Sequence, residues 1–477
     1  MKKNTPKKHA DKDSAPTIKL AEPITVDRRS RADRKDEGKA LRLAVPLASH
    51  AQWHAPLQRR DPIDLLIESG VGRIPELLPI RYGRMMQSPF TFYRGAAAIM
   101  SADLAGLPST GIRVQACGDC HLLNFGSFAT PERRQVFAIN DFDETLPAPW
   151  EWDVKRLAAS FVVAARSNSY RADEAREAAQ TCVRSYRERM REFSKMGVLD
   201  VWYFSIDLEA AIEKVEDEIA KERGKKRMTK ARDRDVMDED FPEMVTFEGG
   251  VHRIRDNPPL IFHAQGEDAA ALEARVREAF EAYRATLAED RRLLLDRYEY
   301  KDLAMKVVGV GSVGTRCGLM LMMGGADDVL FLQVKEANAS VLEPYAGKST
   351  YTNHGQRVVM GQRLMLSASD IFLGWTESSI GKHFYIRQLR DMKLKPQVEL
   401  FTPAVMNQYA ELCGWALAQA HARSGDAAKI AGYLGKKEDF DSAIADFSER
   451  YADQNELDYK ALVQAVREGR LEVYLER

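Results

Sequence analysis

The chain has 477 residues, of which 45% are hydrophobic and 30% are charged. This length and composition are typical of a globular protein with room for two or three packed lobes. The net charge of −1 provides no overall positive field that would attract nucleic acid. Its five cysteines are too few and too scattered for a disulfide framework, which favours a reducing compartment.

Residues 1–50 are predicted to form a disordered, charged tail. Charged residues are frequent there, and no apolar segment follows them as it would in a secretory signal. No apolar stretch of the chain approaches the roughly 20 residues that a membrane-spanning helix needs. We therefore expect a cytoplasmic protein with no membrane partner.

The remaining chain alternates between helical and strand-like patterns. Apolar residues at helical spacing predict helices over 61–78, 152–196, 207–235, 268–297 and from about 403 onward. Short strands and turns are expected over 112–146. A period of two predicts strands at 307–314, 318–323, 329–334, 370–376 and 383–389. Gly324-Gly325 with Asp327-Asp328 is a hairpin signal between 318–323 and 329–334.

The segment Gly118-Asp119-Cys120-His121-Leu122-Leu123-Asn124 is the first candidate for chemistry. Asp119 and Asn124 have the spacing of the catalytic aspartate and metal-binding asparagine in kinase catalytic loops. Asp141 and Asp143 follow the apolar run 136–139, so a strand would bring their carboxylates to the same place. Hard oxygen ligands of this kind suit Mg²⁺. Taken alone, each motif is also ordinary turn chemistry.

The same segment contains a histidine and a pair of cysteines. His121 is a candidate site residue, and we expect it to be hydrogen-bonded and structural rather than a metal ligand or base. Cys117 and Cys120 form a Cys-x-x-Cys pair, which fits a redox or zinc role. We treat that match as coincidence, because no second cysteine pair completes a zinc site.

A glycine-rich segment over 309–314 is the candidate phosphate cradle, through Gly309, Gly311, Ser312 and Gly314. Backbone N–H groups of such a segment can approach phosphates closely. It is not a Walker loop, because no Gly-Lys-Ser/Thr follows. A Rossmann loop is disfavoured because a strand is expected after it, and a plain tight hairpin remains an alternative.

Lys335 ends the predicted strand 329–334, where a kinase places the cation that holds the nucleotide phosphates. Glu343 is expected to pair with it, with Glu336 as a rival. A strand-end lysine that faces water is the alternative. The basic run 221–230 is interpreted as a solvated face or, less favoured, as a lid over an acidic acceptor.

The order of these motifs resembles a rearranged kinase. The glycine segment and Lys335 follow the Gly118–Asn124 loop, whereas they precede it in ordinary kinases. Residues 417–422 resemble the helix that precedes the Gly-Asp-x-His-x-x-Asn loop in aminoglycoside-phosphotransferase-like kinases. Moving the chain break to that junction restores the usual order, which indicates a circular permutation.

The sequence also resembles the bacterial domain-of-unknown-function family 2252, from about residue 55 to about 450. The resemblance rests on specific stretches: 79–85, 88–90, 92–95, 118–126, 140–145, 150–153 and 421–426. This family supplies no established reaction. Arg81, Arg84 and Arg94 belong to its pattern, as does Asp426, and their roles are open.

The distant resemblance to aminoglycoside-phosphotransferase-like kinases implies roles for the motif residues. Asp119 would be the base or the carboxylate that orients the acceptor, Asn124 and Asp141 would hold the metal, and Lys335 would bind phosphate. Asp153 would buttress the catalytic loop. Asp143 departs from the glycine found after Asp-Phe in many kinases and is included with the metal ligands.

The expected fold is therefore α+β and protein-kinase-like, with two lobes, a circular permutation and a helical insertion. Residues 51–300 form the expected helical lobe with the catalytic loop, metal-binding segment and insertion. Residues 301–395 form the small, mostly antiparallel nucleotide-binding lobe. Residues 396–477 are expected to be helices that pack on the helical lobe.

The resulting hypothesis is an ATP- and Mg²⁺-dependent phosphotransferase that acts on a small-molecule or protein hydroxyl. Two alternatives stay open: a kinase-like enzyme that transfers AMP, and a non-catalytic nucleotide-binding module. Nucleic acid is not indicated as a partner. The sequence indicates neither the acceptor nor the oligomeric state.

Overall fold

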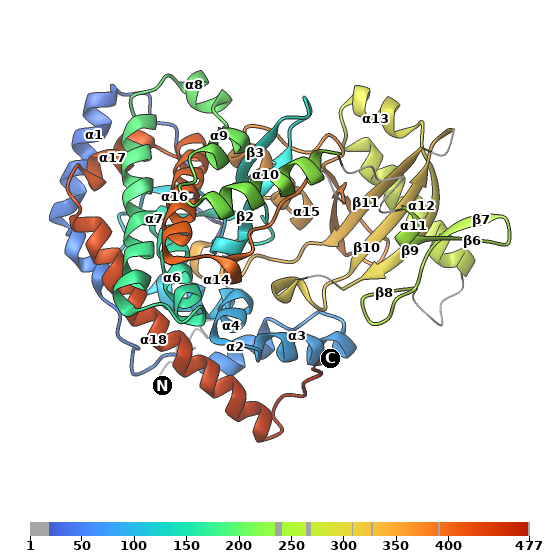
Figure 1. Cartoon of the computed structure of the whole chain (residues 1–477), viewed down its shortest axis with the longest axis horizontal. Helices are drawn as coiled ribbons and strands as arrows, with labels where there is room; N and C mark the ends of the chain where they lie inside the picture. The colour runs from blue at the N-terminus through green and yellow to red at the C-terminus, as the bar shows by residue number, and fades with distance from the viewer. Residues whose placement is uncertain are drawn as a thin grey trace, which may run out of the picture.

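Apolar stripes at helical spacing build one part of the molecule, and alternating apolar strands build the other. The computed structural model describes residues 19–233, 241–263, 269–307, 309–325, 328–389 and 392–475. Most of the described elements are helices, and the strands form antiparallel sheets, so the α+β prediction is confirmed. Figure 1 shows the helices gathered on one side and the largest sheet on the other.

Helix α6 (Trp150–Ser167) is the centre of the helical part, because every residue from Trp150 to Ala165 is buried. A helix buried all round must be enclosed by other elements. Its neighbours are α7 (Ala172–Phe193), α16 (Pro403–Ser424) and α18 (Asp439–Arg467). The helical predictions for 152–196 and for the chain after 403 are confirmed, the former as two helices.

Residues 19–50 correct the prediction of a disordered tail. Helix α1 (Arg31–Ala40) packs along α17 (Ala427–Leu434), although almost all of its side chains are exposed or half-buried. Two glycines allow this close approach. A Cβ at Gly38 would lie 2.0 Å from the Lys429 carbonyl oxygen, and one at Gly432 would lie 2.1 Å from the Lys35 carbonyl oxygen. Residues 1–18 lie outside the described part of the chain.

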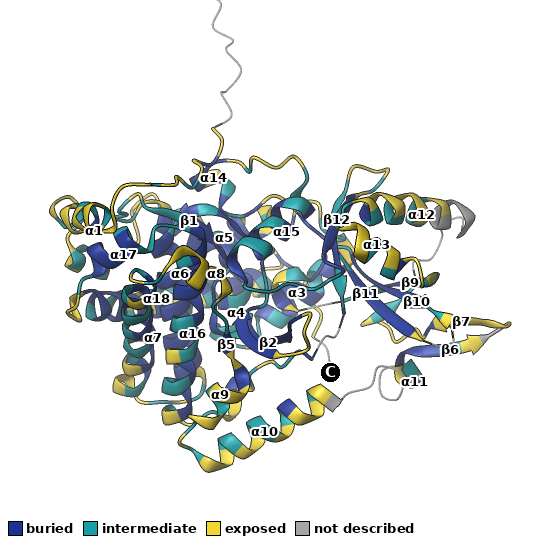
Figure 2. Cartoon of the chain, turned by 90° about the horizontal axis from the view of Figure 1, so that it is seen from above, coloured by how far each residue is buried: buried dark blue, intermediate teal, exposed yellow. Residues whose placement is uncertain are grey.

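Shorter helices connect and cover these parts. Those before the sheet are α2 (Pro62–Glu68), α3 (Leu78–Met85), α4 (Pro89–Gly95), α5 (Ala97–Ala105), α8 (Val198–Tyr203), α9 (Leu208–Glu213), α10 (Glu218–Asp233) and α11 (Phe241–Met244). Those beside the sheet are α12 (Ala269–Ala285), α13 (Glu289–Leu295) and α15 (His354–Met365), whereas α14 (Glu343–Ala346) contacts α5 in the helical part. Figure 2 shows α10 as a largely exposed helix at the edge of the molecule.

The largest sheet has six antiparallel strands in the order β12-β13-β11-β10-β9-β8. In chain order these are β8 (Ile261–Phe262), β9 (Glu299–Lys306), β10 (Cys317–Met323), β11 (Val329–Glu336), β12 (Gly374–Glu377) and β13 (His383–Gln388). The predictions for 318–323, 329–334 and 383–389 are confirmed. The predicted strand at 307–314 is wrong, because β9 ends at Lys306; Val308 lies outside the described residues, as does Asp327 of the hairpin signal.

Both faces of this sheet are covered, as the uninterrupted apolar run of β10 requires. On one face, Leu319 and Leu321 pack with the hairpin of β6 (Val245–Glu248) and β7 (Val251–Ile254). On the other face, Met320 and Met322 pack against α12 and α13. The sheet part therefore includes residues before 300, and the expected lobe boundary at residue 300 does not follow the packing.

Two small sheets sit beside the helical part and frame its loops. Strand β1 (Arg113–Ala116) pairs with β4 (Leu146–Pro149). Strand β3 (Gln135–Ile139) lies between β2 (Phe125–Ala129) and β5 (Ile206–Asp207). The segments expected to carry chemistry connect these strands. Among the helices that the structure describes, none has both the length and the apolar character needed to cross a bilayer.

The packing of α1 leads to a stability prediction. Gly38→Ala should destabilise the protein by about 1–3 kcal/mol, because overpacking a close contact forces the backbones apart. Thermal unfolding measures the loss, and limited proteolysis should show earlier cleavage near residues 31–40. Gly106→Ala is the matched control, because a Cβ at Gly106 meets nothing within 4 Å. Equal stability of the two variants would contradict the account of this contact.

Candidate functional site

The Gly118–Asn124 loop is supported by Asp153, in the first turn of α6. This buried carboxylate accepts hydrogen bonds from the backbone N–H groups of Cys117 (2.6 Å) and Gly118 (3.0 Å). The Nε2 atom of His421, on α16, lies 3.1 Å from the same carboxylate. Buried backbone donors need such partners, so Asp153 fixes the position of the loop.

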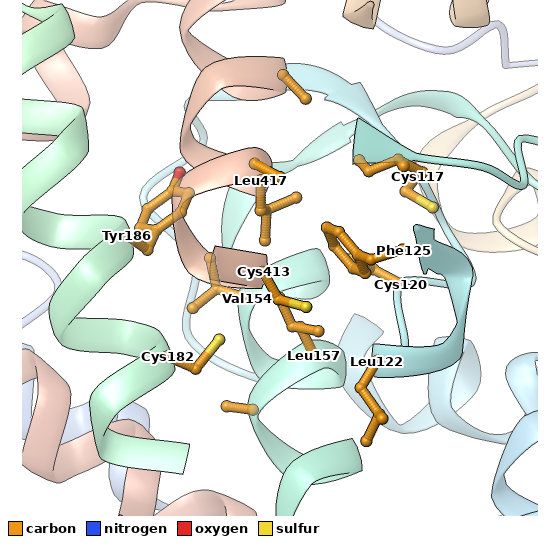
Figure 3. Packing of buried hydrophobic residues seen from close by; sticks show 14 of the residues in the cluster. Cys117, Cys120, Leu122, Phe125, Val154, Leu157, Cys182, Tyr186, Cys413 and Leu417 are labelled. Atoms are coloured by element: carbon orange, nitrogen blue, oxygen red, sulfur yellow. The ribbon is translucent and has the colours of Figure 1, made fainter. Parts of the chain in front are cut away.

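Apolar packing fixes the other side of the loop. Figure 3 shows Cys120 and Phe125 beside Leu157 of α6 and Leu417 of α16, within one buried cluster. All five cysteines are buried and free. The hydrogen bond with Cys120 lowers the pKa of Cys117, but burial and the nearby carboxylates outweigh it and raise that pKa to about 11, so the thiol stays protonated at neutral pH. Within the described residues no cluster of three or more metal-ligating His, Cys, Asp or Glu side chains occurs.

Asp119 extends from this loop toward open space and is clamped by Arg156. The Nε and Nη2 atoms of Arg156 donate to the same oxygen, Oδ1, at 2.8 and 2.5 Å. Burial raises the pKa of Asp119, although Arg156 and Arg94 oppose that rise. Arg156 lies three residues after Asp153 on α6, so both face the loop. That spacing is the signal by which the sequence could have identified Arg156.

Asn124 ends the short 3₁₀ turn Leu122–Asn124 and folds back on the loop. Its amide Nδ2 donates to the backbone carbonyl of Asp119 at 2.7 Å. The side chain therefore ties the end of the loop to the backbone of Asp119. This contact uses the amide nitrogen and leaves the amide oxygen as the remaining acceptor.

His121 differs from its prediction as a hydrogen-bonded structural residue. Its Nδ1 atom is buried without a hydrogen-bond partner, and Nε2 lies 3.9 Å from Asp119 Oδ2. Burial, with the nearby charges of Arg94 and Arg156, lowers the pKa of His121 well below its usual value. The imidazole is therefore neutral and has an unused polar atom.

Asp141 and Asp143 follow β3, as the apolar run before them predicted, and they meet Lys335 from the sheet. The Lys335 ammonium lies 2.5 Å from Asp143 Oδ2 and 3.7 Å from Asp141 Oδ2. Asp143 also accepts hydrogen bonds from the hydroxyls of Tyr385 (2.8 Å) and Ser312 (3.1 Å). Lys335 is thus buried among acids and does not face water.

The two carboxylates differ in their protonation behaviour. Burial and repulsion from Asp143 raise the pKa of Asp141, although Lys335 and Arg387 oppose the rise. Burial acts in the same direction on Asp143, but the contacts with Lys335 and Tyr385 hold its pKa below the usual value. The negative charge at Asp141 is therefore incompletely compensated, which favours an additional cation nearby.

The glycine-rich segment is a loop between β9 and β10, with a 3₁₀ turn at Val310–Ser312. It rests on the helical part, because Arg73 donates to the Val313 carbonyl at 2.6 Å and the backbone N–H of Ile74 donates to the Gly314 carbonyl at 2.7 Å. A Cβ at Gly311 would lie 3.8 Å from Asp119 Oδ2. The loop therefore passes directly over the Asp119 carboxylate.

Glu343 is not the partner of Lys335. It begins α14, and its Oε1 atom lies 3.9 Å from His354 Nδ1. Glu336, the rival, pairs instead with Arg316 (3.3 Å) and Lys382 (3.2 Å). The acids that contact Lys335 come from the other part of the molecule, which the sequence separation concealed.

One cavity of about 1160 Å³ collects most of the predicted residues. Its lining includes Asp119, His121, Asn124, Asp141, Asp143, Gly309, Gly311, Ser312 and Lys335. Three predicted residues do not line it: Asp153, Gly314 and Glu343. Helix α10, which contains the whole basic run 221–230, contributes Arg227 and Lys230 to the wall.

The other family-pattern residues have varied positions. Asp426 caps α17 by accepting from the backbone N–H groups of Ala428 and Lys429, both at 3.0 Å. Arg81 is buried and donates to Ser69 Oγ at 3.0 Å. Arg94 lines the cavity, and its Nε atom is buried without a hydrogen-bond partner. Arg84 has interactions of its own and does not line the cavity.

Comparison with known proteins gives a family but no reaction. Residues 73–465 match the family described as "Uncharacterized protein conserved in bacteria (DUF2252)", and the chain belongs to this family. No curated protein and no solved structure matches the chain.

The role of Asp153 as a support for the loop predicts a large stability effect. Asp153→Ala would leave the Cys117 and Gly118 N–H groups buried and unpaired, each at a cost of about 1–3 kcal/mol. Urea unfolding measures the loss. Asp173→Ala, which removes an exposed carboxylate on α7, should leave stability unchanged. If both variants unfold at the same urea concentration, Asp153 does not support the loop.

Proposed function

We propose that this chain is an ATP- and Mg²⁺-dependent phosphotransferase with a kinase-like, circularly permuted arrangement, acting on a hydroxyl acceptor. The observation that carries the proposal is the meeting of two distant chain segments in one cavity. Asp119, Asn124 and Asp141 come from one segment, and Lys335 and the 309–314 loop come from the other. These are the parts that phosphoryl transfer needs: a carboxylate at the acceptor, oxygen ligands for a metal, a cation and a backbone loop.

Contacts at the end of α16 support the permuted order. Ser424 Oγ accepts a hydrogen bond from the Gln115 backbone N–H at 3.2 Å, and a Cβ at Gly425 would touch Val114. The end of α16 therefore lies beside β1, which leads into the Gly118–Asn124 loop. A chain that passed directly from α16 to β1 would read sheet, helix, catalytic loop and metal segment, the usual kinase order.

The acidic residues fit a Mg²⁺ ion that shares its coordination with phosphates. Mg²⁺ is commonly held by one or two carboxylates together with substrate phosphates and water, and not by an all-protein cage. Asp141 and Asp143 provide two carboxylates, and Asn124 provides an amide oxygen. The incomplete compensation at Asp141 fits an added divalent cation. Bound there, Mg²⁺ would neutralise charge on the phosphates.

The chain's own residues suit in-line transfer. Arg156 holds Oδ1 of Asp119, which leaves Oδ2 facing the cavity as the acceptor of the hydroxyl proton. The acceptor oxygen then forms its bond to the γ-phosphorus, and ADP leaves with the electron pair of the broken bond. Lys335 would exchange its carboxylate contacts for the phosphates. The neutral His121 adds no charge beside Asp119.

Asp141 is the carboxylate that we propose binds the metal. Asp141→Ala should abolish Mg²⁺-dependent turnover of ATP, because it removes one of the two carboxylates at the metal position. ADP release in the presence and absence of Mg²⁺ measures this. Asp290→Ala, which removes an exposed carboxylate of α13, is the control and should keep full turnover. Full activity of Asp141→Ala would contradict the proposed metal role.

Asp119 is the carboxylate that we propose accepts the proton of the acceptor hydroxyl. Asp119→Asn should lower kcat by about 10²-fold or more and leave nucleotide affinity nearly unchanged, because proton acceptance is needed only in the transition state. Steady-state kinetics and ADP binding separate these effects. ATP labelled at the α- or γ-phosphate identifies the transferred group. Label from the α-phosphate in the modified acceptor would establish AMP transfer and contradict phosphoryl transfer.

A further inference from the structure

The walls of the cavity carry more positive charge than the proposed nucleotide chemistry uses. Eleven Arg and Lys side chains line it, against six Asp and Glu. Some of these acids are neutralised by cations that do not line the cavity: Asp119 by Arg156, and Glu336 by Arg316 and Lys382. Arg133, Lys306 and Lys393 have interactions of their own, and eight other cations still line the cavity.

Part of this charge lies beside Asp119. Arg94, at the end of α4, has a buried Nε atom without a hydrogen-bond partner and forms no ion pair with the residues that the structure describes. Its charge acts on both Asp119 and His121. The Arg94 carbonyl lies 3.5 Å from a Cβ placed at Gly311, which puts this residue under the glycine loop at the Asp119 end.

Two more cations extend this cluster. Lys395 is affected by the charges of Asp141 and Arg94, and also by those of Arg387 and Lys335. It forms no ion pair with any described residue. Arg227 of α10 donates to the Lys395 backbone carbonyl at 2.7 Å. Arg94, Lys395 and Arg227 come from three separate segments, and all three line the cavity. We call these three residues the acceptor cluster.

We propose that the acceptor cluster binds a phosphate group carried by the hydroxyl acceptor, so that the substrate is a phosphorylated hydroxyl compound. The proposal rests on the proposed function, because it takes Asp119 as the carboxylate that receives the acceptor hydroxyl. A molecule held at Asp119 places its remaining groups near Arg94. Guanidinium groups match the geometry of phosphate oxygens, and a dianion balances several cations at once.

Arg94 and Arg227 come from the helical part and not from the sheet that carries Lys335, whereas Lys395 is affected by the charges of both Arg94 and Lys335. Lys335 lies on the sheet side, against Asp141 and Asp143. Arg94 lies on the helical side, next to Asp119, and Arg227 comes from α10 at the outer edge. The cavity therefore offers cations on both sides of the carboxylates, one set for each of two anionic ligands.

Inorganic phosphate is the probe for this site, and its binding is measured by isothermal titration calorimetry. The protein is first saturated with Mg²⁺ and AMP-PNP, which fills the γ-phosphate position. Phosphate should still bind, and Arg94→Gln should weaken that binding by about tenfold or more, because a charge-assisted contact is lost. Arg450→Gln, which removes one positive charge outside the cavity, should have no effect. Should Arg94→Gln not fold, Arg227→Gln tests the same cluster.

Three results would overturn the proposal: no phosphate binding by the wild type, binding that competes with Mg²⁺-AMP-PNP, or binding unaffected by Arg94→Gln. Competition would assign the cluster to the nucleotide. Failure of the nucleotide itself to bind would instead contradict the proposed function. In that case the nucleotide-free protein decides: phosphate binding lost in Arg94→Gln but kept in Lys335→Met supports the cluster, and the reverse overturns it.

Discussion

A buried ammonium group between two carboxylates connects the two parts of this molecule. Lys335 belongs to the central strands of the large sheet, and Asp141 and Asp143 follow a strand of the helical part. Buried ion pairs are seldom more stabilising than apolar residues of similar volume. Stability alone therefore gives no reason for a lysine and two aspartates here. Binding of a ligand to Lys335, Asp141 and Asp143 would explain why they are there. The proposed chemistry would then take place at the junction of the two parts.

Other contacts hold the loops on both sides of this junction in fixed positions. Asp153 and the apolar cluster of α6 and α16 hold the Gly118–Asn124 loop from below, and Arg73 and Ile74 hold the glycine loop from above. Asp119 is oriented by Arg156, and Asn124 closes the loop onto it. Preorganised groups of this kind lose little freedom when a substrate binds. The scaffold is thus built from segments that are far apart in the sequence.

The sequence predicted the elements whose signal is local. The apolar alternation of 318–323 and 329–334 identified the central strands, and the apolar run before Asp141 placed its carboxylate correctly at a strand end. The 307–314 segment was misread as a strand because alternating valine and glycine imitates a period of two, whereas the glycines there form a loop over Asp119. The partners of Lys335 could not be predicted, because the lysine and the aspartates meet only through the packing of the two parts.

Helix α1 shows the same limit at the surface. Its sequence has almost no apolar face, so periodicity gives no helix signal. Its contacts are the glycine approach to α17 and ion pairs such as Arg34 with Asp426 (3.0 Å) and Glu37 with Lys429 (2.9 Å). These partners lie near the other end of the chain. Arg156 was missed although the expected position of Asp153 offered a signal, because a residue three positions later on the same helix faces the same loop.

We propose that Asp141, Asp143 and Lys335 surround a metal-bound nucleotide. Electron paramagnetic resonance of Mn²⁺, used in place of Mg²⁺, tests this most directly, because bound Mn²⁺ loses the signal of the free ion. The account predicts that the wild type binds Mn²⁺ when ADP is present and that Asp143→Asn and Asp141→Asn each weaken this binding strongly. Mn²⁺ that stays free with the wild type and ADP, or binds both variants equally well, would contradict it.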